Sequence, residues 1–387
     1  MVSGPSLGQV LDAALAAHEP SLSTHQWRTL DALRRCRTGA LGGHRYRCAD
    51  CGEEHFVPHS CRNRHCPQCQ GSAARDWLEV QRQALLPVPH FHLVFTLPHD
   101  LNPLVRQNRK ALYRLLFASV SQTLLEFGRN NWSAQIGLTA ILHTWSQTLL
   151  DHYHLHCIVP GGGIALEGSS WVASDPNYLF NVHALAKVYR AKFRDGLRRL
   201  WEDGELEFHG QLQPLAAAGS FEKWLAPIVA KNWHVYSKAP FGGPQQVLDY
   251  LGQYTHRVAI TPRRLLSLDE EEVTFAWRDY AHGSRRREMS LKLPEFLRRF
   301  SLHILPSGFV KIRHYGLLAN CHRQQKVALA RELIGRTSTP ADSLSAPAEQ
   351  APSPASEGAA PCCPHCGSEA LELIEIIAGP TAPRAPP

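Results

Sequence analysis

A run of alternating histidines within residues 152–163 constrains this chain more than any other stretch. In an extended strand, residues two apart lie on the same face, so the histidines share one face and aliphatic residues share the other. The histidines are His152, His154 and His156. Because neutral imidazoles bind several divalent metals, the pattern predicts a metal site on one face and a core on the other. An edge strand with a solvated histidine face is the alternative, which the following apolar run and triple-glycine turn disfavour.

Two C-x-x-C pairs stand fourteen residues apart near the N-terminus. Each pair can present two sulfurs from one tight turn, and two such turns complete a tetrahedral zinc site. The sequence therefore predicts one structural zinc ribbon. Its four expected ligands are Cys48, Cys51, Cys66 and Cys69.

Four further metal-binding side chains lie near these pairs and exceed what a single tetrahedral site needs: Cys36, His59, Cys61 and His65. Cys61 or His65 could replace a ligand or help to bind a second ion, and a buried thiol or a surface imidazole is the alternative. Arg62 and Arg64, in the loop before Cys66, suit contacts with phosphates or base edges. We expect these two arginines to matter more for nucleic-acid binding than Arg285–Arg287.

Composition sets the broad class of the protein. With 387 residues and 44% hydrophobic residues, the chain can bury a large core, and its length suggests two or three domains. A net charge of +7, with arginines in short clusters, indicates a polyanionic partner. No apolar run is long enough to span a membrane, and the first residues do not resemble a signal peptide, so we expect a cytoplasmic protein without a membrane partner. In that reducing compartment, cysteine pairs favour metal over disulfides.

Hydrophobic periodicity outlines the remainder of the folded chain. Helical spacing is found over residues 7–35, 102–128 and 183–202, and strand alternation over 91–97 and 136–143. The strand over 136–143 leads into the histidine strand through a short connection, which is typical of an antiparallel pair. The expected fold class is therefore α+β with an antiparallel sheet.

The sequence also suggests where the domains end. We expect a helical and zinc-binding domain over residues 1–86 and a main domain over 87–335. Residues 336–361 are rich in Ala, Ser and Pro and predict a solvated linker. The tail, 362–387, has one further pair, Cys363 and Cys366, beside Cys362 and His365 at awkward spacing. This pair predicts an incomplete or intermolecular metal site, with a vestigial tail as the alternative.

The chain resembles the bacterial rolling-circle insertion-sequence transposases, which join a zinc-binding N-terminal domain to a two-tyrosine endonuclease of the histidine-hydrophobe-histidine superfamily. The resemblance covers about residues 10–335. The matching stretches, in chain order, are Ser60–Cys69, Phe95–His99, the histidine strand through Gly163, Tyr236–Lys238 with Phe241–Pro244, Tyr250–Ile260 and Ile312–Asn320.

This resemblance implies a DNA transposase that cleaves and rejoins single-stranded DNA through a 5′-phosphotyrosine intermediate. It implies a ferredoxin-like antiparallel sheet, a catalytic Mg²⁺ or Mn²⁺, the paired ligands His154 and His156, and the nucleophiles Tyr250 and Tyr254. DNA is the expected partner: single-stranded or hairpin element ends and a target site, in association with the nucleoid. Because no G-x-x-x-x-G-K-[ST] loop is present, host replication or helicase factors are the expected source of unwinding.

The third metal ligand is less specified. His143 ends the preceding strand, and an antiparallel hairpin would bring it to the histidine pair, so it is the expected third ligand. The alternatives are Gln147, His152 and His256.

Two other functions compete with this one. A metal-dependent hydrolase would use the histidine strand to activate water and would leave the tyrosines without a role. A zinc-ribbon DNA-binding protein would explain the charge and the cysteines, but not the histidine strand. On the transposase hypothesis, removal of residues 337–387 is expected to leave single-strand cleavage unchanged.

Overall fold

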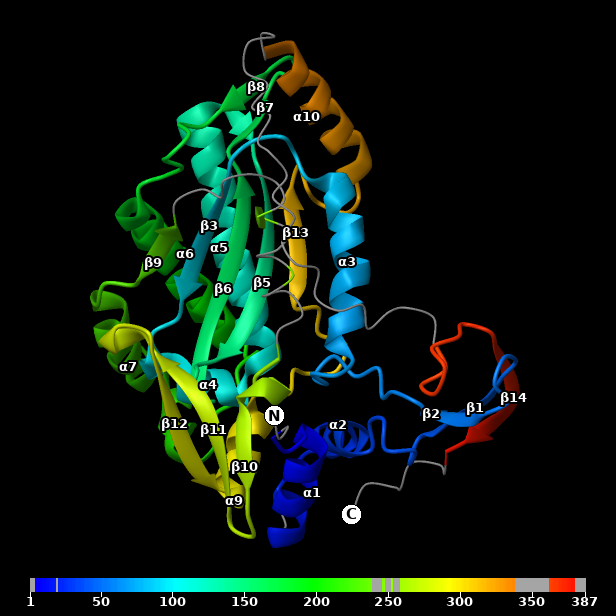
Figure 1. Ribbon diagram of the computed structural model, residues 1–387. Helices are drawn as coiled ribbons and strands as arrows, with labels where there is room; N and C mark the ends of the chain where they lie inside the picture. The colour runs from blue at the N-terminus through cyan, green and yellow to red at the C-terminus, as the bar shows by residue number, and fades with distance from the viewer. Residues whose placement is uncertain are drawn as a thin grey trace.

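A central sheet of five antiparallel strands organises the computed structural model (Figure 1). The structure describes residues 4–18, 20–238, 246–247, 252, 258–337 and 362–379. The strand order is β13-β5-β6-β3-β9, with bounds β3 His90–Thr96, β5 Gly137–Trp145, β6 Asp151–Pro160, β9 Val235–Lys238 and β13 Ile312–Gly316. The predicted α+β fold with an antiparallel sheet is confirmed, and β5 pairs directly with β6 as the short connection indicated.

Helices cover the apolar face of this sheet. They are α4 Asn102–Gln107, α5 Arg109–Trp132, α6 Val182–Glu202 and α7 Ala218–Ala230. The face beneath them includes Phe95 and Leu155, which are fully buried in the largest core. The helix expected over residues 102–128 is broken at Asn108, whose side-chain amide donates to the carbonyls of Leu104 and Glu207. The side chain of Asn108 thus ties this break to the segment after α6.

The opposite face of the sheet carries the histidines. Helix α3, Gln70–Ala84, lies along part of it, and its Trp77 and Leu78 pack near Ile141 and Ile158 (Figure 1). Helix α10, Arg323–Thr337, packs on the end of α3 and on a small sheet of order β4-β7-β8. The strands of that sheet are β4 Ala134–Gln135, β7 Gly162–Ala165 and β8 Trp171–Ala173.

A second core joins the N-terminus to a late part of the chain. Its elements are α1 Leu7–Ala17, α2 Thr24–Arg34, β10 Leu265–Leu268, β11 Glu272–Asp279, β12 Arg285–Lys292 and α9 Leu293–Leu302. Ser6 and Ser23 start the first two helices with capping boxes, which satisfy backbone N–H groups that a helix end leaves unpaired. Buried Val10 and Leu30 then share one cluster with Phe275 and Phe296. The N-terminal helices are therefore anchored on residues far along the chain.

A three-stranded ribbon projects from this body (Figure 1). It contains β1 Gly42–Cys48, β2 Glu54–Pro58 and β14 Leu371–Ala378, in the order β14-β1-β2. Short 3₁₀ turns at His99–Leu101, Gly210–Ala216, Pro262–Arg264 and Tyr280–His282 complete the elements of the described residues. The helices in these described ranges include none with the length and apolar character that a membrane crossing requires. The domain boundaries at residues 86, 335 and 361 stay predictions.

Candidate functional site

Three histidines meet on the face of the sheet opposite α5 and α6. His143 on β5 and His154 on β6 are direct partners across the antiparallel ladder, and His156 follows on the same face of β6. One ring nitrogen from each lies within 4.8 Å of the others, and all three side chains are buried. The Nε2 atoms of His154 and His156 are 3.1 Å apart. The alternation in sequence thus becomes a cluster of converging imidazoles.

Hydrogen bonds from neighbouring groups fix the orientation of two of these rings. Nδ1–H of His154 donates to the carbonyl of His152 over 2.8 Å, which leaves a lone pair on Nε2. Nδ1 of His156 lies 2.8 Å from Nε2 of His92 on β3, and burial lowers the pKa of His92 to about 4. When His156 donates to neutral His92, both Nε2 lone pairs point into the cluster. In that tautomer the two lone pairs repel each other unless a cation lies between them, so the donor set fits a divalent ion, whereas in the opposite tautomer Nε2–H of His156 donates to Nε2 of His154.

His92 was not among the residues singled out from the sequence. A signal for it was present, because His92 alternates with Phe91 and Leu93 and so belongs to the polar face of β3. Of the alternatives for a third ligand, His152 lines the same pocket without joining the cluster of histidine nitrogens, and Gln147 also lines that pocket. His256 lies outside the described residues. The geometry therefore favours His143.

The cluster forms the floor of a pocket of about 840 Å³. Tyr236 and Tyr280 line it with 59% and 63% of their surface exposed, and Trp145 and Trp277 add two further aromatic side chains. Trp145 stacks on His143 at 4.8 Å between ring centres. The pocket wall thus offers aromatic surface beside the candidate metal ligands.

Arginines line the same pocket and the cavity next to it. Arg106 forms an ion pair with the buried carboxylate of Asp151, at the start of β6. Arg278 on β11 and Arg286 on β12 are direct cross-strand partners, and both line an adjoining cavity of about 360 Å³ that shares Trp277 and Tyr280 with the histidine pocket. Like charges directly opposite each other are unfavourable in a sheet. The two guanidinium groups nevertheless concentrate positive charge at this cavity, which suits a polyanion.

The expected nucleophiles, Tyr250 and Tyr254, lie outside the described residues. Two described residues of the same segment are Val247 and Gly252. Val247 is buried against Ile141 and Ile158, which flank the histidines on the same face of β5 and β6, and Gly252 lies against Leu78 of α3. Val247 therefore lies on the histidine face of the sheet, and Gly252 lies beside the helix that covers part of that face.

Eight of the eleven cysteines form two separate clusters, so the single zinc site predicted from the sequence is wrong in its grouping. Cys66 and Cys69 join Cys36 and Cys61, with Sγ–Sγ distances of 3.6–3.7 Å. Cys48 and Cys51 join the C-terminal cysteines Cys363 and Cys366. The two C-x-x-C pairs are separated because the β1–β2 hairpin carries Cys48 and Cys51 at its turn, at the tip of the ribbon (Figure 1). Cys36 and Cys61, which exceeded the needs of a single site, complete the cluster that contains Cys66 and Cys69, called the inner cluster below.

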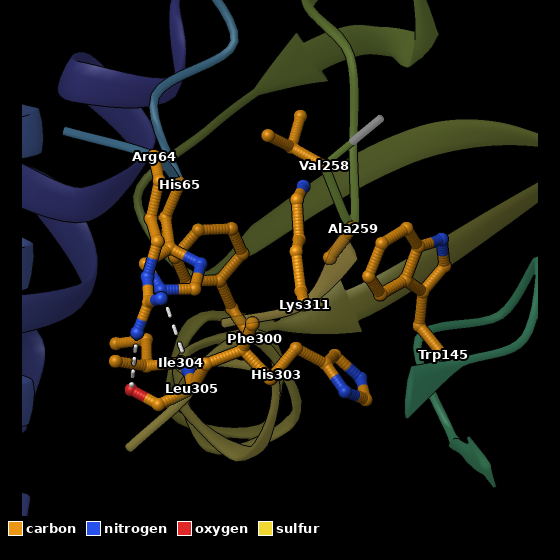
Figure 2. Close-up of a pocket in the computed structure, with 10 residues that line it drawn as sticks. All are labelled: Arg64, His65, Trp145, Val258, Ala259, Phe300, His303, Ile304, Leu305 and Lys311. Atoms are coloured by element: carbon orange, nitrogen blue, oxygen red, sulfur yellow. Dashed lines mark hydrogen bonds between the residues drawn. The ribbon is translucent and has the colours of Figure 1, made fainter. Parts of the chain in front are cut away.

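The part of the loop before Cys66 that carries Arg64 and His65 docks onto the segment that follows α9 (Figure 2). The guanidinium of Arg64 donates to the backbone carbonyls of residues 305, 306 and 309. His65 Nε2 accepts from the N–H of Leu305 over 3.3 Å, and burial lowers the pKa of His65 to about 3. The expected roles of Arg64 as a phosphate contact and of His65 as a substitute zinc ligand are thus wrong, because both groups are used within the protein.

Comparisons with known proteins agree with this arrangement. Residues 137–326 match a family described as putative transposase, and residues 8–97 match a family described as transposase zinc-binding domain. A putative transposase, y4qJ, of Sinorhizobium fredii is 42% identical over 394 residues, which cover 98% of each chain. The transposase for insertion sequence element IS801 of Pseudomonas savastanoi pv. phaseolicola is 28% identical over 306 residues, or 78% of this chain and 72% of the relative.

A solved structure of the conjugative relaxase TrwC in complex with oriT DNA covers 43% of this chain and 71% of its own, at 18% identity and a TM-score of 0.21. A score this low adds nothing to the assignment. The two matched families and the full-length likeness to y4qJ are sufficient: this chain belongs to the IS91-type family of bacterial rolling-circle insertion-sequence transposases, with a zinc-binding domain at its N-terminus.

Proposed function

We propose that this transposase cleaves and rejoins single-stranded DNA at its element ends through a 5′-phosphotyrosine link to Tyr250 or Tyr254. The observation that carries the proposal is the cluster of His143, His154 and His156 on the floor of a pocket lined by aromatic and arginine side chains. A rigid set of imidazoles at the base of a basic, aromatic cavity suits metal-assisted phosphodiester chemistry on an unpaired strand.

The three imidazoles would hold one divalent ion. When bound, it supplies Lewis-acid stabilisation for the charge that builds up on the scissile phosphate. Of the two ions expected from the sequence, Mn²⁺ suits this donor set better, because imidazole binds transition metals whereas Mg²⁺ prefers oxygen ligands. His92 and the carbonyl of His152 orient His156 and His154, so these outer groups determine which ring nitrogens face the ion.

Tyrosine supplies the nucleophile in this mechanism. The phenolic oxygen loses its proton and attacks phosphorus, the bond to the 3′ oxygen breaks, and that oxygen leaves as a 3′-hydroxyl after it gains a proton. The phosphotyrosine ester keeps the phosphodiester bond energy, so rejoining needs no ATP. The packing of Val247 on the histidine face and of Gly252 against α3 supports this assignment, because Tyr250 lies between them in the sequence and Tyr254 follows two residues after Gly252.

We assign the approach of the DNA strand to the β11–β12 side of the pocket. Arg278 and Arg286 would neutralise phosphates, while Trp277 and Tyr280 offer faces for stacking bases. Within the described ranges neither arginine forms an ion pair, whereas the neighbouring Arg287 pairs with Asp279 over 2.9 Å. Because Arg64 is used within the protein, the main binding surface is assigned to Arg278 and Arg286, whereas the contact expected at the exposed Arg62 stays a prediction.

Replacing Arg278 and Arg286 by alanine is expected to flatten the salt dependence of DNA binding. Each phosphate of a single strand that is no longer neutralised lowers the slope of log K against log salt by about 0.7, so the pair should lower it by about 1.4. Fluorescence anisotropy with a single-stranded oligonucleotide over a salt series measures this slope. The charge-matched control is Lys187→Ala with Arg199→Ala on α6, across the sheet from the pocket; an equal decrease there would show that net charge alone is responsible.

We assign the structural zinc of the N-terminal domain to the inner cluster of Cys36, Cys61, Cys66 and Cys69. Four converging thiols in a buried setting suit a closed tetrahedral site. The ion would fix the loop that presents Arg64 and His65 to residues 305–309 (Figure 2). In this way the zinc domain would brace the segment that leads into β13, at the edge of the catalytic sheet.

The proposed function is tested with labelled single-stranded DNA on a denaturing gel. Protein incubated with an element-end oligonucleotide and Mn²⁺ should yield a covalent protein–DNA band, and EDTA should prevent it. Release of free product without a covalent band would instead indicate the metal-dependent hydrolase. Binding with no strand scission in either Mn²⁺ or Mg²⁺ would indicate a DNA-binding protein without cleavage activity.

A further inference from the structure

The last described segment of the chain returns to the N-terminal ribbon and meets its cysteine pair. Cys48 Sγ lies 3.6 Å from Cys366 Sγ, and Cys51 Sγ lies 3.6 Å from Cys363 Sγ. All four sulfurs are within 4.8 Å of one another, and none forms a disulfide, whose S–S bond is about 2.05 Å. We infer that these four cysteines form a second structural zinc site, which closes the chain on itself across 312 residues.

The two halves of this site are copies of one turn. In the first, the N–H of Gly52 donates to the carbonyl of Cys48 over 2.9 Å, and the N–H of Cys48 donates to the carbonyl of Glu53 over 2.9 Å. In the second, the N–H of Gly367 donates to the carbonyl of Cys363 over 2.8 Å, and the N–H of Cys363 donates to the carbonyl of Ser368 over 2.7 Å.

Both glycines have a φ of +77°, which L side chains rarely adopt. The same backbone arrangement in two remote segments aims each pair of sulfurs at one point. The second half is therefore a formed ligand turn, and Cys363 and Cys366 are not the incomplete site that the sequence suggested.

Strand pairing holds the two halves in register. β14 runs antiparallel to β1 from Gly42 opposite Ala378 to Cys48 opposite Leu371. At the other end of the ladder, Gly42 and Gly379 allow an approach that a side chain would block, since a Cβ on Gly42 would lie 2.2 Å from a backbone oxygen. Backbone pairing thus extends from the glycines to the cysteines without interruption other than one bulge.

This ribbon has too little core to be stable by itself. Its large apolar side chains remain substantially exposed, 50% for Leu373, 63% for Ile376 and 43% for Phe56. The ion pair of Arg45 with Glu375 is also half exposed, and such surface pairs contribute little. Small folds without a core depend on disulfides or metals, and the free energy of zinc binding then becomes folding free energy. Four thiolates in a tetrahedral set favour Zn²⁺.

Two of the four ligands, Cys363 and Cys366, lie outside residues 8–97, which match the zinc-binding domain, and the inference does not rest on the proposed DNA chemistry. It predicts two tightly bound zinc ions per chain, measured by elemental analysis after treatment with a weak chelator. Replacing Cys363 and Cys366 together by serine should lower the zinc content from two to one. Cys362→Ser is the matched control, because this exposed neighbour lies outside both clusters, and it should keep two zinc ions.

Cobalt substitution gives a readout that does not depend on total metal. Sulfur-to-cobalt charge-transfer absorption reports thiolate sites and ignores an ion bound only by histidines, so the double serine variant should lose half of this absorption. Cys48 and Cys51 should also become reactive towards a thiol reagent in that variant. Unchanged zinc content or unchanged cobalt absorption would overturn the inference. So would a wild-type dimer in light scattering that dissociates in the double serine variant, since the site would then join two chains.

Discussion

Replacing both Tyr250 and Tyr254 by phenylalanine is expected to abolish the covalent protein–DNA adduct. The phenolic oxygen is the only atom removed from each ring, so packing changes little while the proposed nucleophile disappears. Either single replacement should retain some first-strand cleavage, because the remaining tyrosine can attack, yet complete transposition should be impaired because two strand ends must be held in turn. Quantified adduct bands on a denaturing gel and a transposition assay in cells measure these two outcomes.

The structure provides matched controls for this experiment. Tyr236 and Tyr280 also line the histidine pocket and are exposed. Tyr236→Phe and Tyr280→Phe should retain the adduct, since a phenyl ring still stacks on bases. Persistence of the adduct in the Tyr250 and Tyr254 double variant would show that another residue attacks the phosphate.

His154→Ala is expected to lower the rate of adduct formation by about a thousandfold. The change removes one of three ring ligands, and loss of metal-ion stabilisation costs about 4 kcal/mol of barrier. His92→Ala should lower it by about 10- to 100-fold, the usual cost of losing a group that orients a metal ligand. The affinity for Mn²⁺, measured by calorimetry, should fall in the same order.

His99→Ala serves as the control for these histidine variants. His99 lines the same pocket, but it does not belong to the cluster of ligand nitrogens. Its replacement should leave Mn²⁺ affinity unchanged, and thermal melting should verify that each variant folds. A His154→Ala protein that folds, binds Mn²⁺ normally and forms the adduct at the original rate would exclude the histidine cluster as the catalytic metal site.

Local patterns in the sequence were sufficient to predict the sheet and its histidine face. The alternation over residues 152–156 places the histidines on one face of a strand and apolar residues on the other, and the short connection from β5 favoured an antiparallel neighbour. This neighbour relation brings His143 opposite His154. Such inferences succeed because strand periodicity and hairpin geometry act over a few residues.

The cysteine grouping could not be obtained in the same way. Spacing between Cys51 and Cys66 is compatible with one ribbon, but the competing partners Cys363 and Cys366 are more than 300 residues away in sequence. Their pairing depends on β14 joining β1, a long-range pairing that leaves no periodic signal near Cys48. The surplus of Cys36 and Cys61 was the one local indication that two sites share these ligands.

Arg64 was misassigned for a related reason. Its position just before the C-x-x-C pair of Cys66 suggested a basic loop that faces solvent. In the structure, its guanidinium donates instead to three backbone carbonyls within residues 305–309. Nothing near Arg64 in the sequence identifies those acceptors. Conversely, Arg278 and Arg286 became prominent only when strand register placed them opposite each other.

Peptide mapping of the covalent adduct tests the central claim most directly. Wild-type protein is incubated with Mn²⁺ and a single-stranded element end, digested with nuclease and trypsin, and analysed by mass spectrometry. Cleavage after Lys238 and Arg257 gives a peptide of residues 239–257 that contains both Tyr250 and Tyr254, while Tyr236 and Tyr280 fall in other peptides. The account predicts a nucleotide-bearing residues 239–257 peptide with the phosphate on one of these two tyrosines. A nucleotide attached to Tyr236, Tyr280 or any residue other than Tyr250 and Tyr254 would contradict it.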